Sequence, residues 1–418
     1  MMKKVKQPSN LLQKFFLLMI GLEIVFFFLC SDIYMQISGF YLPLLPAMVV
    51  GVIWLYKNFW KISHYQFAFL TLFIGIILAS YNSFYQNESG YLFSYIMLIF
   101  MAFILTTMDL DEKEVEFLSH CYILVGLIIA FIIEIVRYRY YALETRYTIK
   151  IGDNPALDPN YLAAFLIGPF LLALRFVAKR ETIIQKLIYI GFAIIIAFGV
   201  FLTESRGGLL SVILMTLLVL IRSIKRRLNK KETIIILCAL AVLTGIALIL
   251  IPTKTFKRMF NISTWIDASN KKRLGLWVNA VNAIAHRPLF GFGLAATENS
   301  FVSVTGMYGA AHNTLLELWG QVGILAIVAL VDIAIILFRK KSDWYGQVLF
   351  IGTIAVSLFI SCEATLMFWL NIAFCLILAK MNVKKERQDE FFNQCYRTGV
   401  QCRKLPRSVF RKYMRANV

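Results

Sequence analysis

Residues 252–323 read PTKTFKRMFNISTWIDASNKKRLGLWVNAVNAIAHRPLFGFGLAATENSFVSVTGMYGAAHNTLLELWGQVG. They form the longest polar interruption in the chain, and long apolar segments flank them on both sides. Three features meet here: the basic run KKR at 271–273, the tight turn GFG at 291–293, and His312-Asn313 at the start of the next apolar segment. We therefore expect a loop at a membrane surface that carries part of a functional site.

The composition indicates an integral membrane protein. Of the 418 residues, 59% are hydrophobic and 16% are charged, and the mean hydropathy is +0.71. Soluble domains hold about 45–50% apolar and about 25% charged residues. The apolar runs are continuous rather than alternating, which favours transmembrane helices. The length accommodates about twelve helices of ~20 residues with short connections.

The positive charge follows the membrane topology. The net charge of +19 lies mostly in short segments between apolar spans, which is typical of topology determinants and contacts with anionic lipid rather than of nucleic-acid binding. The seven cysteines show no CxxC spacing, so neither a disulfide framework nor a zinc site is indicated. The N-terminal apolar run lacks a small-residue cleavage site, and we interpret it as an uncleaved first helix.

Apolar spans and their connections predict an all-α fold with four regions. We expect transmembrane helices 1–9 in residues 1–251, an extracytoplasmic loop at 252–312, helices 10–12 in 313–380, and a basic cytoplasmic tail at 381–418. The predicted spans are 11–30, 40–56, 66–80, 91–108, 115–136, 160–178, 183–203, 207–222, 233–251, 313–338, 344–361 and 364–380.

The positive-inside rule places both termini in the cytoplasm and the long loop outside. One acidic connection is the exception, because Asp109-Leu110-Asp111 spells a DxD sequence of the kind that holds metal-bound nucleotide sugars. It lies on the predicted cytoplasmic side at a helix start, where acidic residues are favoured anyway. No other acidic pair suits a metal, so we expect metal-independent chemistry and no cofactor.

Charged residues at membrane depth mark the first candidate site. Glu204, Ser205, Arg206 and Gly207 lie at a short junction between two apolar spans, where ionisable groups are costly and usually functional. Arg206 carries a permanent bidentate cation that suits diphosphate oxygens. A Glu204–Arg206 pair that merely caps a helical hairpin is the structural alternative.

Residues 273–286 read as an amphipathic helix lying on the outer leaflet. Its apolar face is expected to comprise Leu274, Trp277, Val278, Val281 and Ile284, opposite Asn279 and Asn282. Arg273 begins this helix and can point toward the membrane. The alternative is that the 271–273 cluster only contacts lipid phosphates.

His312 joins the polar loop to the next membrane helix. Its unperturbed pKa makes it a natural proton acceptor near neutrality, although a histidine that is only hydrogen-bonded to the loop is an equal alternative. Asn313 follows it directly, and two further outer segments are candidates for glycan or phosphate contacts. They are Arg146 and Lys150 in the 137–159 loop, and Asp158 and Asn160 at its end.

These motifs resemble the O-antigen ligase and O-antigen polymerase superfamily of bacterial envelope glycosyltransferases. The ordered set covers about residues 160–325, whereas the first half is similar only in being helical. It consists of Asp158-Pro159-Asn160, Thr203-Glu204-Ser205-Arg206-Gly207, Arg273 with Trp277, Pro288 to Gly293 including Gly291, His312-Asn313, and Gly320 with Gly323.

The resemblance implies a polyprenol-dependent (GT-C-like) glycosyltransferase of the bacterial inner membrane. Its donor is a glycan on undecaprenyl diphosphate at the outer leaflet, and its acceptor is a second lipid-linked glycan or lipid A–core. Arg206 and Arg273 would stabilise the diphosphate and His312 would accept the proton. A flippase and a chain-length regulator are the implied protein partners, and nucleic acid is not one.

The sequence leaves three other functions open. The ligase alternative differs from the favoured polymerase of O-antigen, capsule or exopolysaccharide units only in its acceptor. A flippase for the lipid-linked glycan would also need a basic cavity, but the chain shows no internal repeat of the kind typical of transporters. A membrane scaffold without catalysis would leave the placement of Arg206 and His312 unexplained.

Overall fold

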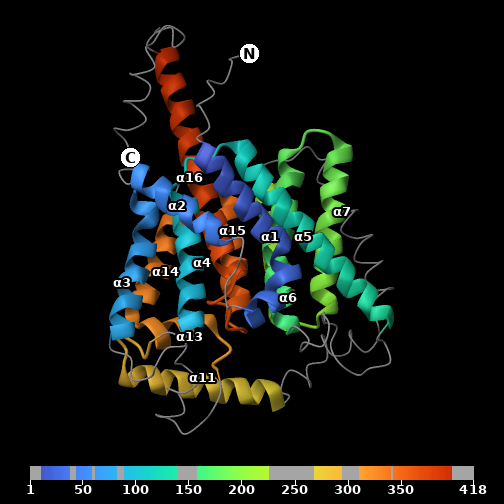
Figure 1. Ribbon diagram of the computed structural model, residues 1–418. Helices are drawn as coiled ribbons and strands as arrows, with labels where there is room; N and C mark the ends of the chain where they lie inside the picture. Colours follow the sequence, from blue (N-terminus) through green and yellow to red (C-terminus); the bar gives the residue numbers. More distant parts are fainter. Residues whose placement is uncertain are drawn as a thin grey trace.

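The fold consists of helices wherever the chain is described. The computed structural model describes residues 11–37, 44–58, 62–81, 89–139, 158–225, 268–293, 310–339 and 342–397. Within these ranges there are thirteen α-helices, one short 3-10 helix and no strand (Figure 1). The helices in chain order are α1 (Leu11–Ile37), α2 (Leu44–Asn58), η2 (His64–Gln66), α3 (Phe67–Tyr81), α4 (Ser89–Thr107), α5 (Glu112–Arg139), α6 (Pro159–Lys179), α7 (Ile183–Leu202), α8 (Arg206–Lys225), α11 (Ala268–His286), α13 (Thr314–Val322), α14 (Ile324–Leu337), α15 (Trp344–Ser357) and α16 (Leu366–Arg397).

The predicted apolar spans correspond to these helices, except for 233–251, which lies outside the described residues. In the described part of the chain, five helices are long and apolar enough to cross a membrane by length and composition. The protein is therefore an integral membrane protein built of helices. Residues 381–397 continue α16 as a helix beyond its apolar part, and Figure 1 shows this end projecting from the bundle.

The predicted single helix at 313–338 is wrong, because the chain breaks at Gly323. Gly323 has a φ of 81° and separates α13 from α14. A Cβ at this position would overlap the Leu289 carbonyl and would lie 2.7 Å from Phe290 N. Only glycine allows the backbone of the preceding turn to approach this closely.

That turn, residues 288–293, is hydrogen-bonded to the α13–α14 break, and we call this arrangement the latch. Gly291 has a φ of 64°, and a Cβ there would lie 2.6 Å from the Gln321 carbonyl oxygen. The two segments thus meet backbone to backbone at two glycines. The bonds are Phe292 N to Gly320 O (2.8 Å), Gly293 N to Gln321 O (3.0 Å), Ile324 N to Pro288 O (3.0 Å) and Trp319 Nε1 to Pro288 O (3.0 Å).

The helix α11 lies across one end of the bundle, crosswise to the other helices (Figure 1). Ala280 and Ala283 are fully buried and cluster with Phe292 of the latch and with Ala311 before α13. Small side chains of this kind allow helices to approach closely. The latch therefore fixes α11 against the bundle at the place where its sequence is least bulky.

The predicted apolar face of α11 is only partly correct. Ile284 is buried and Trp277 is partly buried, but Leu274, Val278 and Val281 are 59%, 59% and 54% exposed. The packed face is instead formed by Leu276, Ala280, Ala283 and Ile284. The helix thus carries two apolar stripes, one against the protein and one exposed, and an exposed apolar stripe suits a helix in a membrane interface.

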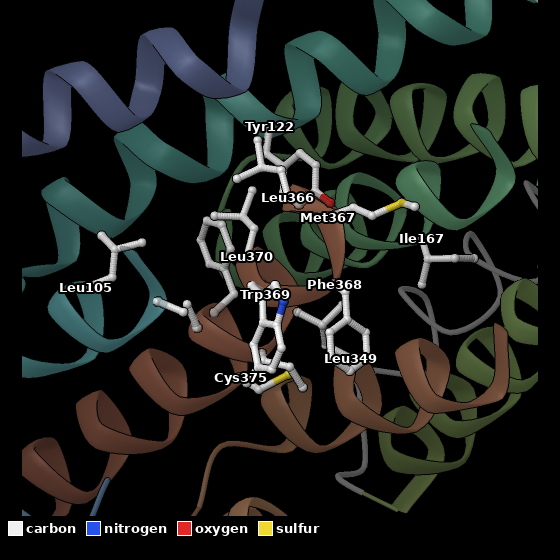
Figure 2. Close-up of a cluster of buried hydrophobic side chains, with 14 of the residues drawn as sticks. Leu105, Tyr122, Ile167, Leu349, Leu366, Met367, Phe368, Trp369, Leu370 and Cys375 are labelled. Atoms are coloured by element: carbon white, nitrogen blue, oxygen red, sulfur yellow. The ribbon is translucent and has the colours of Figure 1, made fainter. Parts of the chain in front are cut away.

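The first half of α16 is the centre of the core. Nearly every residue from Leu366 to Ala379 is buried. Figure 2 shows Met367, Phe368 and Trp369 surrounded by side chains from other helices, including Tyr122 and Leu349. Trp369 also donates from Nε1 to the Glu363 carbonyl oxygen (2.6 Å), which fixes the turn that precedes α16.

The opposite end of the bundle holds the connections predicted to be cytoplasmic. Lys380 Nζ lies 3.5 Å from Asp109 Oδ1, and Lys179 Nζ lies 2.7 Å from Glu112 Oε1. Asp111 accepts from Glu114 N (2.9 Å), and Glu114 accepts from Asp111 N (2.8 Å). The DxD sequence therefore contributes an ion pair and a helix cap, and the cap agrees with the helix start expected there.

Substitution of Gly323 by alanine tests the latch. We expect Gly323→Ala to lower the unfolding free energy by about 2–4 kcal/mol, because the new Cβ meets backbone atoms at a left-handed φ. The matched control is Gly275→Ala in α11, where a Cβ meets nothing within 4 Å, and where alanine should stabilise the helix by about 0.5–1 kcal/mol. Thermal unfolding in detergent measures both, and equal changes would contradict the latch.

Candidate functional site

The turn at residues 358–365, between α15 and α16, is where the candidate segments meet. It contacts the start of α6, the start of α8, the face of α11 and the start of α13. The contacts are Tyr161 Oη to Ser361 O (2.7 Å), Gly207 against the Phe359 ring, the Trp277 ring 6.4 Å from the Phe359 ring, and Thr314 Oγ1 to Ile360 O (2.7 Å).

Arg206 is the first residue of α8 and is partly exposed. The buried Ser205 precedes it and accepts from Gly208 N through its hydroxyl (3.3 Å), so it acts as the helix cap. The cation therefore stands at a helix N-terminus, where the helix dipole also favours an anion. Both features give this position a strong preference for negative charge.

Glu204 adopts a left-handed backbone with a φ of 55° and is buried. The flanking turn is fixed by Glu204 N to Phe201 O (3.0 Å) and by Thr203 Oγ1 to Val200 O (2.7 Å). In the described residues, the only other non-glycine residue with a positive φ is His312, at 50°. Strain of this kind is often retained at functional positions, and both residues were candidates from sequence.

Gly207 packs directly beneath the aromatic ring that α11 also contacts. A Cβ on Gly207 would lie 2.9 Å from Phe359 Cδ2. On α11, Trp277 meets the same ring, and Arg273 lies one helical turn before Trp277 on the same face. Arg206 and Arg273 thus each stand within one helical turn of a residue that touches Phe359. Arg273 is partly exposed.

His312 is exposed and lies directly before α13. Asn313 is the N-cap of that helix, and its Oδ1 accepts from Leu315 N (3.0 Å) and Leu316 N (3.2 Å). The amide of Asn313 is therefore used to start the helix. Ala311, the residue before it, packs with Ala280 and Ala283 of α11, so His312 lies at the end of the molecule that α11 covers.

Several predicted binding residues also have structural roles. Gly291 and Gly293 form the latch, and Asp158 caps α6 by accepting from Asn160 N (2.7 Å). Asp158 is nonetheless exposed and Asn160 partly exposed, so both remain accessible at this end. Arg146 and Lys150 lie outside the described residues.

Two buried acidic residues near His312 were not among the sequence candidates. Glu317 is 1% exposed and Glu363 is 3% exposed. Glu363 accepts from Gln321 Nε2 (3.3 Å), and burial together with the charge of Glu317 raises the pKa of Glu363 well above its usual value. The argument from membrane depth that singled out Arg206 applies equally to both.

Groups that can bind an anion and a group that can accept a proton lie at one end of the protein. Two cations, one of them at a helix N-terminus, can bind an anionic group and stabilise charge that develops on it. A histidine exposed at the same end can accept a proton. These are the groups needed to transfer a substituent away from a phosphate-type leaving group.

Comparison with known proteins finds a family match in the same region. The sequence profile of the O-antigen ligase family (Wzy_C) matches residues 191–331. The match begins within α7 and ends within α14, so it includes the start of α8, α11, the latch and His312. No curated protein and no solved structure matches the chain. Residues 191–331 are thus an O-antigen ligase family domain, carried by an all-helical integral membrane protein.

Proposed function

We propose that this protein is a membrane glycosyltransferase that moves a glycan from undecaprenyl diphosphate to an acceptor hydroxyl. The observation that carries the proposal is the convergence of the Arg206 turn and the Arg273 helix on Phe359. The family match over residues 191–331 supports it, because that family acts in membrane glycan transfer of the ligase or polymerase type.

The two arginines bind the diphosphate of the donor. A guanidinium offers a planar fork of N–H donors that matches phosphate oxygens in a way that an ammonium does not. The position of Arg206 at the start of α8 adds the positive end of the helix dipole to its charge. As the bond between the sugar C1 and the diphosphate oxygen breaks, negative charge grows on the diphosphate, and these groups stabilise it.

His312 accepts the proton of the acceptor hydroxyl. The hydroxyl oxygen forms the new bond to C1, undecaprenyl diphosphate leaves with the electron pair of the broken C1–O bond, and the hydroxyl proton moves to the imidazole. Diphosphate is already a good leaving group, so the protein supplies positioning and charge stabilisation. In this scheme two arginines take the place that a metal ion holds in other glycosyltransferases.

The site lies at the outer leaflet in this proposal, with both termini in the cytoplasm. The segregation of connections supports this orientation: the segments predicted outside meet at the 358–365 turn, and those predicted inside form the ion pairs of Lys179 and Lys380. Lipid-linked donors are available at the outer leaflet, whereas nucleotide sugars are not. The exposed stripe of α11 then lies in that leaflet.

Polymerisation of polysaccharide repeat units is the favoured reaction. A polymerase and a ligase would use the same donor. The acceptor of a polymerase is a second lipid-linked glycan, and the acceptor of a ligase is lipid A–core. The name of the matched family keeps the ligase as the second candidate. Incubation with each acceptor separates them, because a polymerase lengthens the lipid-linked glycan and a ligase modifies only lipid A–core.

Removal of the guanidinium groups tests the donor site. We expect Arg206→Ala and Arg273→Ala each to lower the transfer rate by roughly a hundredfold or more, which is the usual loss when one charge-stabilising group is removed. Arg206→Lys and Arg273→Lys should also be impaired, because lysine keeps the charge but loses the fork. The measurement is glycan ladder formation in a polymer-deficient strain at matched membrane levels.

Arg287→Ala is the control for nonspecific charge at this surface. Arg287 lies just after α11, with its guanidinium 5.4 Å from the Phe292 ring, and the proposal gives it no contact with the donor. Its loss should leave ladders close to wild type. Equal defects in all three alanine variants would assign Arg206 and Arg273 to general lipid binding instead.

Transfer by the purified protein in detergent separates an enzyme from a flippase. We expect the protein to lengthen a lipid-linked glycan when no membrane separates two compartments, because the chemistry needs only donor, acceptor and site. The reaction should continue in EDTA, since arginines rather than a metal stabilise the leaving group. Loss of transfer outside a membrane would favour the flippase, and loss in EDTA would contradict the metal-independent scheme.

A further inference from the structure

The backbone on both sides of His312 is held by separate hydrogen bonds. Before it, the Ala311 N–H donates to Glu317 Oε1 (2.5 Å). After it, Thr314 is bound to the 358–365 turn through Thr314 N to Ile360 O (3.0 Å) and Cys362 N to Thr314 Oγ1 (2.9 Å). His312 stands between these anchors with a φ of 50°. A non-glycine residue keeps such a conformation only where its surroundings fix it.

Glu317 connects this backbone to the rest of the candidate site. It lies in the first turn of α13, is 1% exposed, and reaches back past Asn313 to Ala311. The same oxygen accepts from Ser361 Oγ (3.3 Å). Ser361 belongs to the turn whose Phe359 meets Gly207 and Trp277. One carboxylate thus joins the segment that bears His312 to the turn on which the arginine-bearing helices rest.

We propose that Glu317 is a positioning residue for His312, holding the Ala311 amide so that the imidazole faces the acceptor hydroxyl. This inference rests on the proposed function, because it assumes that His312 accepts the acceptor proton. Glu317 does not touch substrate itself: its side chain is buried, and Oε1 already accepts from Ala311 and Ser361. Its effect on the reaction passes through the backbone of His312.

The double-mutant cycle of Glu317→Met with His312→Ala is the sharpest test. Methionine fills similar space and favours a helix, but it cannot accept the Ala311 hydrogen bond. In purified protein, Glu317→Met should lower kcat by roughly tenfold to a hundredfold, as expected for a displaced reacting group, with the donor KM unchanged. In the His312→Ala background, the same change should have no further effect on the residual rate.

Two further variants keep the test decisive if Glu317→Met does not accumulate. Glu317→Gln keeps an oxygen that can accept from Ala311, so it should transfer at close to the wild-type rate. Glu363→Gln alters the other buried carboxylate, which has no bond to Ala311, and should also be near wild type. A loss of a hundredfold in Glu317→Gln would instead assign the carboxylate charge to the chemistry and overturn the positioning role.

The outcomes distinguish this inference from the proposed function. If His312→Ala transfers normally, the proton-accepting role of His312 fails, and the positioning role fails with it. If His312→Ala is impaired but the effects of Glu317→Met and His312→Ala on the rate multiply, the function stands and the positioning role is overturned. A raised donor KM with kcat unchanged in Glu317→Met would also overturn it, because the defect would then lie in donor binding.

Discussion

The close backbone contact between residues 288–293 and 319–324 is the constraint on which the proposed site depends. Its two glycines, Gly291 and Gly323, leave no room for a Cβ. Each hydrogen bond across the contact contributes only about 0.5–1.5 kcal/mol net, yet together they join the end of α11 to the break between α13 and α14. The latch therefore sets where α11 lies relative to the membrane helices.

A second constraint comes from the centre of the core. Trp369, buried in α16, donates to the carbonyl oxygen of Glu363 and so fixes the 358–365 turn. That turn then supports the starts of α6, α8 and α13 and the face of α11. The densely packed helix α16 thus holds the candidate segments in place through one short turn. The turn itself lies beyond the region matched by the family profile.

The continuous apolar runs were sufficient to predict the helices, because a chain in lipid must satisfy its backbone within each segment. They could not reveal the break at Gly323, since a single glycine in an apolar run is compatible with an unbroken helix. The face of α11 was misassigned for a related reason. Bulky residues define its exposed stripe, whereas the packed stripe depends on Ala280 and Ala283, whose small size is what allows contact.

The candidate site was predictable where charge interrupts an apolar run, as at Glu204, Arg206 and His312. The connection between the spans 344–361 and 364–380 was expected, but its role was not, although Glu363 interrupts an apolar run there in the same way as Arg206 does. Phe359 could not be singled out among 35 phenylalanines. Its importance arises from tertiary contact with Gly207 and Trp277, which sequence spacing does not encode.

Mapping of donor contacts shows directly whether the Arg206 turn and α11 bind one donor molecule. A polyprenyl diphosphate with a photoreactive group beside the diphosphate would be crosslinked to the purified protein, and the modified peptides identified by mass spectrometry. If both segments bind the donor, adducts should form in peptides from the 203–208 turn and from α11, and unlabelled donor should compete with this labelling. Adducts confined to the other end of the bundle, near Arg175, Arg180 or Lys380, would contradict the proposed donor site.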